Sequence, residues 1–170
     1  MKSKTDTTNI HVKTNTSVKT NTKNTSIGKK VMCFGTFDIL HLGHVNYFEQ
    51  AKQRGEHLTV VIARDETKQK QQKNILFSEQ ERLQLIQSLK VVDEAVLGNA
   101  ENHFKIIVEK KPDIVCLGYD QAISELVVEE KLRSLGLKAK VLRMQPYQEE
   151  RQKSTRLRNE LEVVSEERSK

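Results

Sequence analysis

From residue 31 onward, short apolar runs alternate with longer stretches that place apolar residues at helical spacing. The short runs are rich in Val, Ile and Leu, which suits strands that are buried on both faces of a parallel sheet. The longer stretches suit helices that pack one side against such a sheet. This alternation is typical of α/β domains in which each helix connects two parallel strands.

The pattern predicts five strands, over residues 31–34, 58–63, 94–97, 114–117 and 139–143. It predicts helices over residues 44–54, 103–110 and 123–135, another that opens at Ser78, and a last one from Ser154. Right-handed crossovers between consecutive strands then give an open, doubly wound sheet. We therefore expect a single α/β domain with a Rossmann-like, five-stranded parallel sheet, for which the 170 residues suffice.

Local signals mark several ends of these elements. Ser78 precedes Glu81 by three residues, which is the capping box of a helix. Gly55 is expected to cap the end of the helix over residues 44–54. Residues 64–77 are polar and rich in Lys and Gln, so we expect a long connection there that covers a site or stays mobile.

The first part of the chain has a different composition. Residues 1–29 consist mainly of Thr, Lys, Asn and Ser, which predicts a disordered basic tail before a folded domain over residues 30–170. Of the 29 basic and 23 acidic residues in the chain, residues 1–30 hold seven Lys and one acid, Asp6. The net charge of +6 therefore lies in the tail, and residues 31–170 carry 22 residues of each sign. This distribution argues against a nucleic-acid partner for the folded surface.

Composition also bears on location. The chain has no apolar run of about 18 residues, and its start lacks the apolar centre of a signal peptide, so we expect neither a membrane span nor secretion. Cys33 and Cys116 lie in separate apolar runs, which favours reduced core residues over a disulfide or a zinc site. These features predict a cytoplasmic protein without a membrane partner.

Polar residues follow all five predicted strands. These junctions are Gly35 to Asp38, Arg64 and Asp65, Gly98 and Asn99, Gly118 to Asp120, and Arg143 and Met144. In a doubly wound sheet, ligands bind at the carboxyl ends of the strands, near the point where the strand order switches. We therefore expect a binding site at this edge of the sheet.

The densest signal is the run Gly35-Thr36-Phe37-Asp38-Ile39-Leu40-His41-Leu42-Gly43-His44. His41 and His44 are three residues apart at the start of a helix, so both imidazoles can face one ligand beside the positive end of the helix dipole. Gly43 between them allows a nucleotide to approach the backbone closely. Phosphoryl transfer needs positioning and charge stabilisation, which two such histidines can supply.

Metal ligation and a purely structural role are the alternatives for the two histidines. A metal-binding pair is more often spaced by four residues with a third ligand nearby, and a structural pair does not need the surrounding Gly, Thr and Asp. We therefore assign no direct protein ligand to a metal.

This run resembles the GTFDxLHxGH motif of the cytidylyltransferase-like nucleotidyltransferases. The resemblance extends through most of residues 31–156, with further landmarks at residues 63–67, 81–82, 92–94, 111–115 and 117–121. In detail these landmarks are most similar to those of archaeal-type FAD synthases. The resemblance implies a nucleotidyltransferase that joins a nucleoside triphosphate, ATP or CTP, to FMN, releases pyrophosphate and uses Mg²⁺.

The resemblance also implies roles for individual residues. His41 and His44 would be the catalytic residues, which bind phosphates and stabilise the transition state, and Asp120 would lie beside the nucleoside. The implied nucleotide-binding set is Gly35, Thr36, Phe37, His41, Leu42, Gly43, His44, Asp120, Tyr147, Ser154 and Thr155. Lys70 and Lys73 are candidate phosphate contacts or simply solvated side chains.

Tyr147 and Asp38 have open alternatives, whereas Ser154 and Thr155 have one implied role. Ser154 and Thr155 open the last helix where the family has a Ser/Thr pair that grips phosphate. Tyr147 could stack on a base or cover the core. Asp38 could orient the turn or the metal shell, or cap a helix.

Glycerol-3-phosphate cytidylyltransferases carry an Arg-Thr-x-Gly-Ile-Ser-Thr-Thr segment, whereas the stretch from Arg143 to Thr155 lacks the Gly-Ile pair and the second of the paired Thr residues. These sibling enzymes are therefore a weaker match, and FMN is the expected acceptor. Transfer to glycerol 3-phosphate or to a sugar phosphate is the alternative, and a non-catalytic nucleotide- or RNA-binding protein is a remote one. Relatives of this size often form dimers, so a homodimer is also considered.

Overall fold

Five parallel strands form one sheet in the order β3-β2-β1-β4-β5. The computed structural model describes residues 28–71 and 74–148. The strands are β1 (Lys30–Gly35), β2 (His57–Ile62), β3 (Glu94–Leu97), β4 (Ile114–Leu117) and β5 (Lys140–Arg143). The helices are α1 (Leu42–Lys52), α2 (Asp65–Lys70), α3 (Glu79–Gln87), α4 (Lys105–Lys110) and α5 (Glu125–Ser134). All five predicted strands are present.

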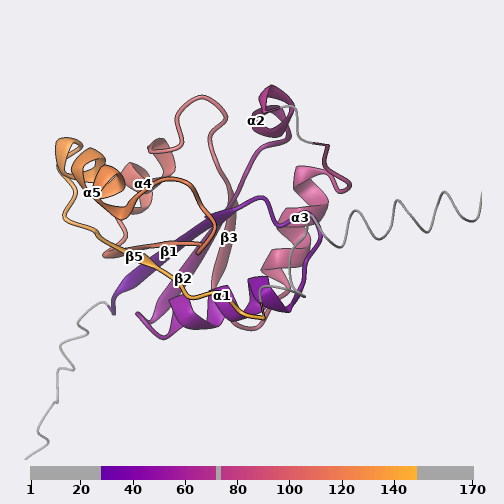
Figure 1. The fold of residues 1–170 in the computed structure, drawn as a ribbon, viewed down its shortest axis with the longest axis horizontal. Helices are drawn as coiled ribbons and strands as arrows, with labels where there is room; N and C mark the ends of the chain where they lie inside the picture. The colour runs from indigo at the N-terminus through magenta and orange to yellow at the C-terminus, as the bar shows by residue number, and fades with distance from the viewer. Residues whose placement is uncertain (1–27, 72–73, 149–170) are drawn as a thin grey trace, which may run out of the picture.

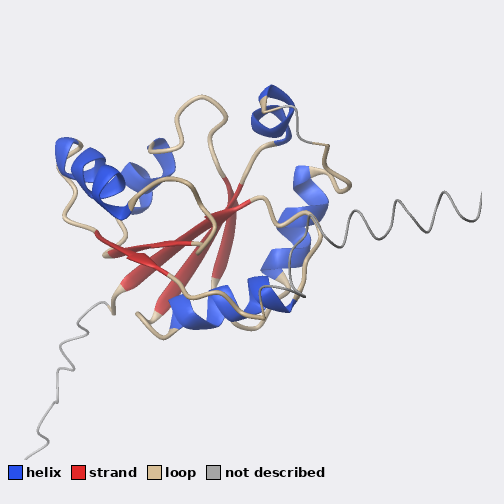
Figure 2. Ribbon diagram, viewed as in Figure 1, coloured by secondary structure: helices blue, strands red, loops and turns tan. Residues whose placement is uncertain are grey.

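The chain builds the sheet outward from β1 in both directions. Helix α1 leads from β1 to β2, α2 and α3 lead on to β3 at one edge, and α4 crosses back to β4 on the other side of β1. Helices α1 and α3 cover one face of the sheet, and α4 and α5 cover the other (Figures 1 and 2). This arrangement confirms the predicted doubly wound, Rossmann-like sheet, whose order switches between β1 and β4.

Apolar side chains seal both faces of the sheet. Along β1, Cys33 packs in the cluster that contains Phe48 of α1, whereas Met32 packs in the cluster that contains Leu132 of α5. Because successive strand residues point to opposite faces, a strand covered on both sides must be apolar throughout. This burial on both faces explains why continuous apolar runs predicted the strands.

The role predicted for Gly55 was wrong. Helix α1 ends at Lys52 with Gln53 as its C-cap, two residues before Gly55. A Cβ atom at Gly55 would lie 2.4 Å from the carbonyl oxygen of Lys29, so the two backbones approach too closely for any side chain.

The long connection expected over residues 64–77 was also only partly right, because it contains helix α2. The sequence hides this helix because Thr67 is its one buried residue, which leaves no apolar periodicity to detect. The capping box that opens α3 is confirmed: the Ser78 hydroxyl accepts from the Glu81 N–H, and the Ser78 N–H donates to the Glu81 carboxylate. The predicted helix from Ser154, and all but the last two residues of the tail over residues 1–29, lie outside the described residues.

Helix α3 carries one charged side chain into the interior. The side chain of Arg82 is completely buried, a position that the sequence did not reveal. Its guanidinium donates to the carbonyl oxygens of Thr36 at 2.6 Å, Ala63 at 2.9 Å and Phe77 at 3.0 Å, and to the Asp65 carboxylate at 2.6 Å. One side chain thus joins the loop after β1, the end of β2 and the start of α3.

Asp65 and Glu79 extend this network toward β3. Each donates its backbone N–H to the carboxylate of the other, at 2.9 and 3.0 Å. The Glu79 carboxylate also accepts from Arg64, whose Nε donates to the carbonyl oxygen of Gly98, directly after β3. The carboxyl ends of three adjacent strands are therefore held in a fixed relation.

Replacing Arg82 by Met should lower the free energy of unfolding by about 3 kcal/mol, because three carbonyl groups lose a donor and Asp65 loses its charged partner. Urea denaturation followed by circular dichroism measures the change. The matched control is Arg133→Met at the exposed end of α5, which should shift stability by less than about 0.5 kcal/mol. An Arg82→Met protein as stable as the control variant would contradict the assigned role.

Candidate active site

The carboxyl ends of β1 and β4 meet where the strand order switches. The loop from Thr36 to His41 follows β1 and leads directly into α1, and the loop from Gly118 to Ser124 follows β4. The N-terminus of α1 therefore lies at the same edge as both loops. The structure brings most of the predicted site residues to this edge.

Phe37 bends the first loop back over its own strand. Its backbone φ of +54° is a conformation that costs a bulky residue on the order of 1–3 kcal/mol. The ring is buried so close to Gly35 that a Cβ atom there would lie 2.3 Å from it. It also packs edge-on against His44, with ring centroids 5.2 Å apart. Gly35 and Phe37 thus set the position of His44, and a contact of Phe37 with nucleotide stays a prediction.

His41 and His44 stack on each other at the start of α1. Their ring centroids are 3.8 Å apart, and the ring planes differ by 24°. His41 is the N-cap of the helix, and its Nδ1 accepts a hydrogen bond from the Gly43 N–H at 3.1 Å. A neutral His41 therefore carries its proton on Nε2, which is the nitrogen that can donate.

The environment favours the uncharged form of both histidines. Burial, with a smaller contribution from His41, lowers the pKa of His44 to about 3. Burial also lowers the pKa of His41, although the negative charge of Asp120 opposes this shift. Nδ1 of His44 is buried and has no hydrogen-bond partner among the described residues. A buried polar atom without a partner, in a pair of histidines with shifted pKa values, is typical of a site that a ligand completes.

The loop after β4 is fixed by Arg143 and Gln121. Arg143 donates to the carbonyl oxygens of Gly118 at 2.8 Å and Gln121 at 2.9 Å, and it pairs with both carboxylate oxygens of Glu125 at 3.0 Å. The Gln121 side chain donates to the carbonyl oxygen of Phe34 at 2.9 Å. These bonds anchor the loop between β5, α5 and β1, so that Asp120 is presented from a fixed backbone.

Three described arginines at this edge are bound to the protein itself. Arg64, Arg82 and Arg143 each pair with a carboxylate and with at least one backbone carbonyl. They hold the loops in place and are largely engaged before any ligand arrives. Among the described residues, the positive character at the motif comes from the N-terminus of α1 and the N–H groups of the two histidines.

Asp38 has a role that the sequence left open. Its buried carboxylate accepts hydrogen bonds from the backbone N–H groups of Leu76, at 2.9 and 3.0 Å, and Phe77, at 2.9 Å. His41, rather than Asp38, is the N-cap of α1. Asp38 therefore anchors the segment before α3 to the motif.

The other predicted site residues lie as follows. Leu42 begins α1 with an exposed side chain, and Asp120 is also exposed. Lys70 lies on the exposed surface of α2, where its Nζ bonds to Glu66 at 2.7 Å. Its predicted contact with phosphate stays untested. Lys73, Ser154 and Thr155 lie outside the described residues.

Tyr147 follows β5 in a segment that is tied to α1. Gln50 and Gln145 exchange two hydrogen bonds, at 2.9 and 3.0 Å, between the Gln50 side chain and the Gln145 backbone. Tyr147 is half-buried two residues later. The structure therefore keeps it on the α1 side of the sheet, and its stacking on a base stays a prediction.

Other sequence predictions concern metal, cysteine and membrane. Among the described residues, no group of three or more His, Cys, Asp or Glu side chains could hold a metal ion. Cys33 and Cys116 are free, buried thiols in register on β1 and β4, and burial raises the pKa of Cys33, as expected of reduced core residues. Within residues 28–71 and 74–148, no helix is long and apolar enough to cross a membrane.

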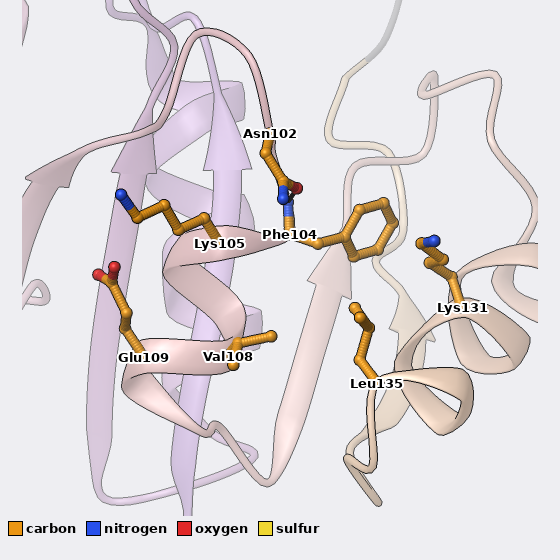
Figure 3. Close-up of a pocket in the computed structure, with 7 residues that line it drawn as sticks. All are labelled: Asn102, Phe104, Lys105, Val108, Glu109, Lys131 and Leu135. Atoms are coloured by element: carbon orange, nitrogen blue, oxygen red, sulfur yellow. Dashed lines mark hydrogen bonds between the residues drawn. The ribbon is translucent and has the colours of Figure 1, made fainter.

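A cleft of about 370 Å³ lies between α4 and α5, on the face of the sheet opposite α1 (Figure 3). Phe104, Val108 and Leu135 line it, with the Lys131 ammonium 5.9 Å from the centre of the Phe104 ring. None of the predicted site residues lines this cleft. The predicted site residues described by the structure therefore lie apart from this cleft.

The low pKa of His44 predicts a pH-dependent stability. In the unfolded chain His44 binds a proton near its ordinary pKa of 6.5, whereas the folded protein resists protonation down to about pH 3. The stabilisation is therefore complete above pH 6.5 and is lost as the pH falls through this window. Between pH 7 and 5, wild type should lose about 2 kcal/mol more unfolding free energy than His44→Asn, at about 1.4 kcal/mol per pH unit.

Urea denaturation at the two pH values measures this difference. His103→Asn, on an exposed histidine, is the matched control and should keep the wild-type pH dependence. Equal pH dependence in wild type and His44→Asn would show that His44 is not buried in its neutral form.

Comparison with known proteins supports the same fold. The model of the cytidylyltransferase-like family matches residues 32–160. A protein named FAD synthase from Thermoplasma volcanium is 42% identical over 81% of this chain and 97% of its own length. Another of that name from Ferroglobus placidus is 47% identical over 68% of this chain and 76% of its own length.

Solved structures agree with these relatives. A protein from Thermoplasma volcanium, described as a lipopolysaccharide core biosynthesis protein, is similar with a TM-score of 0.69 and 45% identity, over 71% of this chain and 98% of its own. Pantothenate synthetase from Thermus thermophilus shares the fold alone, with a TM-score of 0.53 and 15% identity, over 72% of this chain and 57% of its own. The predicted nucleotidyltransferase class is confirmed by the family match and the relatives. The chain belongs to the cytidylyltransferase-like family, together with relatives that bear the name FAD synthase.

Proposed function

We propose that this protein is an FAD synthase, which transfers the nucleoside monophosphate of ATP or CTP to FMN and releases pyrophosphate. The observation that carries the proposal is the stacked pair of His41 and His44 at the N-terminus of α1. This arrangement offers neutral imidazole donors and a helix end to one anionic ligand. The names of the relatives, at 39–47% identity, support FMN as the acceptor.

The reaction requires positioning and charge stabilisation more than covalent catalysis. A phosphate oxygen of FMN forms a bond to the α-phosphorus of the triphosphate. The bond from that phosphorus to the oxygen bridging to the β-phosphate breaks, and pyrophosphate leaves with the electron pair. His41 donates from Nε2 to a phosphate oxygen, because its Nδ1 is engaged by Gly43. The stacked His44 adds a second imidazole where negative charge gathers in the transition state.

Mg²⁺ fits the site as a partner of the triphosphate. It prefers oxygen ligands, so phosphate oxygens would hold it, with the exposed carboxylate of Asp120 as the protein group close enough to act on His41. When bound, the metal neutralises phosphate charge. The histidines, as nitrogen donors, are left to the phosphates.

We extend the proposal to three features of the chain. The free thiols of Cys33 and Cys116 fit a cytoplasmic location. The tail over residues 1–29 is proposed to lie outside the catalytic domain, which would begin at residue 30. A homodimer is proposed on the size of the chain alone.

Incubation of the protein with Mg²⁺, each triphosphate and a panel of phosphate monoesters tests the acceptor. FMN should give FAD and an equal amount of pyrophosphate, detected by chromatography and a coupled phosphate assay. The panel includes glycerol 3-phosphate and a sugar phosphate. Consumption of one of these acceptors, with no FAD formed from FMN, would contradict the proposal and favour the sibling enzymes.

Replacing His44 by Ala should lower kcat by a factor of about 10²–10³, the usual loss for one transition-state donor. Steady-state kinetics of FAD formation measures the effect. His103→Ala is the control, because this exposed histidine lies outside the site and its replacement should leave kcat unchanged. A folded His44→Ala protein with wild-type turnover would exclude the catalytic role of this residue.

A further inference from the structure

Two apolar side chains beside the motif are held in solvent by a buried framework. Leu76 is 65% exposed and Phe77 is 40% exposed. Their backbone N–H groups donate to the buried carboxylate of Asp38, and the carbonyl oxygen of Phe77 accepts from the buried guanidinium of Arg82. The backbone of this segment is therefore fixed on both sides while its side chains face water.

The burial of these two side chains is incomplete in the free protein. Exposed Leu and Phe side chains forgo the burial that stabilises the core, and a fixed backbone prevents them from turning inward. Asp38 and Arg82 are both charged, and burying them costs free energy that only their hydrogen bonds offset. A rigid apolar surface exposed at the edge of a binding site is typical of a surface that an apolar part of a ligand covers.

The aromatic residues of the chain narrow the choice of ligand contacts. The sequence contains five Phe, three Tyr and no Trp, and all eight lie in the described residues. Phe37, Phe48 and Tyr47 are buried, and the others apart from Phe77 are half-buried. Phe77 is thus the aromatic side chain most available to a planar ring.

The position of this surface suits an acceptor that has a phosphate at one end and a ring at the other. Asp38, which holds Phe77, directly follows Phe37, whose ring contacts His44. Arg82 binds the carbonyl oxygens of both Thr36 and Phe77, so the surface and the motif share one anchor. The surface therefore lies a short way from the phosphate site. The ribityl chain of FMN separates its phosphate from its ring in the same manner.

We propose that Leu76 and Phe77 form the surface on which the isoalloxazine ring of FMN stacks, and that they set the preference for a flavin over acceptors without a ring. This inference rests on the proposed function, because it assigns one part of the same substrate. Asp38 acts as a positioning residue, since it touches the segment and not the ring.

A tryptophan placed at this position reports the contact directly. Phe77→Trp introduces the one Trp of the chain, whose fluorescence FMN should quench in a saturable manner when the rings stack. Leu126→Trp, at a 71% exposed position of α5 on the other side of the sheet, is the matched control and should show no saturable quenching. Equal responses of the two variants, or none in either, would overturn the assignment.

Kinetics gives a second test that needs no new fluorophore. Phe77→Ala should raise the KM for FMN about 10-fold, because one ring-on-ring contact is lost. The kcat and the KM for the triphosphate should change by less than about twofold. Phe77→Tyr keeps the ring and should restore the KM. An unchanged KM for FMN in Phe77→Ala would overturn the inference while FAD synthesis by wild type stands.

The proposed function and the proposed ring surface can fail independently of each other. A wild-type protein that forms no FAD contradicts that function, and absence of quenching in Phe77→Trp then removes the ring surface as well. Saturable quenching by FMN in a protein that forms no FAD would leave the ring surface supported and the reaction rejected.

Discussion

The buried guanidinium of Arg82 holds three segments at the carboxyl edge of the sheet in a fixed relation to one another. It binds the loop that carries the motif through Thr36, the end of β2 through Ala63 and Asp65, and the start of α3 through Phe77. Burial of such a group is tolerated because each hydrogen bond satisfies a backbone carbonyl or a carboxylate that would otherwise lack a partner. The fold thus uses a charge to join loops that apolar packing alone would leave independent.

Because Arg82 is fully engaged by protein groups, the positive character of the candidate site has to come from elsewhere. Arg64 and Arg143 are also engaged by carbonyl groups and carboxylates at the same edge. The chain has a net charge of +6, but the excess lies in residues 1–30. At the motif itself, the proposed phosphate site consists of neutral imidazoles and a helix N-terminus, which act at short range. Donors at fixed positions stabilise negative charge that develops at one point in the transition state more than they bind anions in general.

The strands and the motif could be predicted from sequence because their signals are local. A strand covered on both faces is apolar throughout, and the pair His41 and His44 stands in one short run. The remainder depends on contacts between distant residues. The burial of Arg82 and the exposure of Phe77 are not marked by any local pattern in the sequence. Only the folded chain shows that Asp38 and Arg82 together hold Phe77 in solvent.

A crystal structure with FMN and an ATP analogue that has a methylene bridge between its α- and β-phosphates tests the central claim most directly. We predict phosphate oxygens within hydrogen-bond distance of both His41 and His44, and the isoalloxazine ring against Phe77. A nucleotide bound in the cleft between α4 and α5, or phosphates that touch neither histidine, would contradict it.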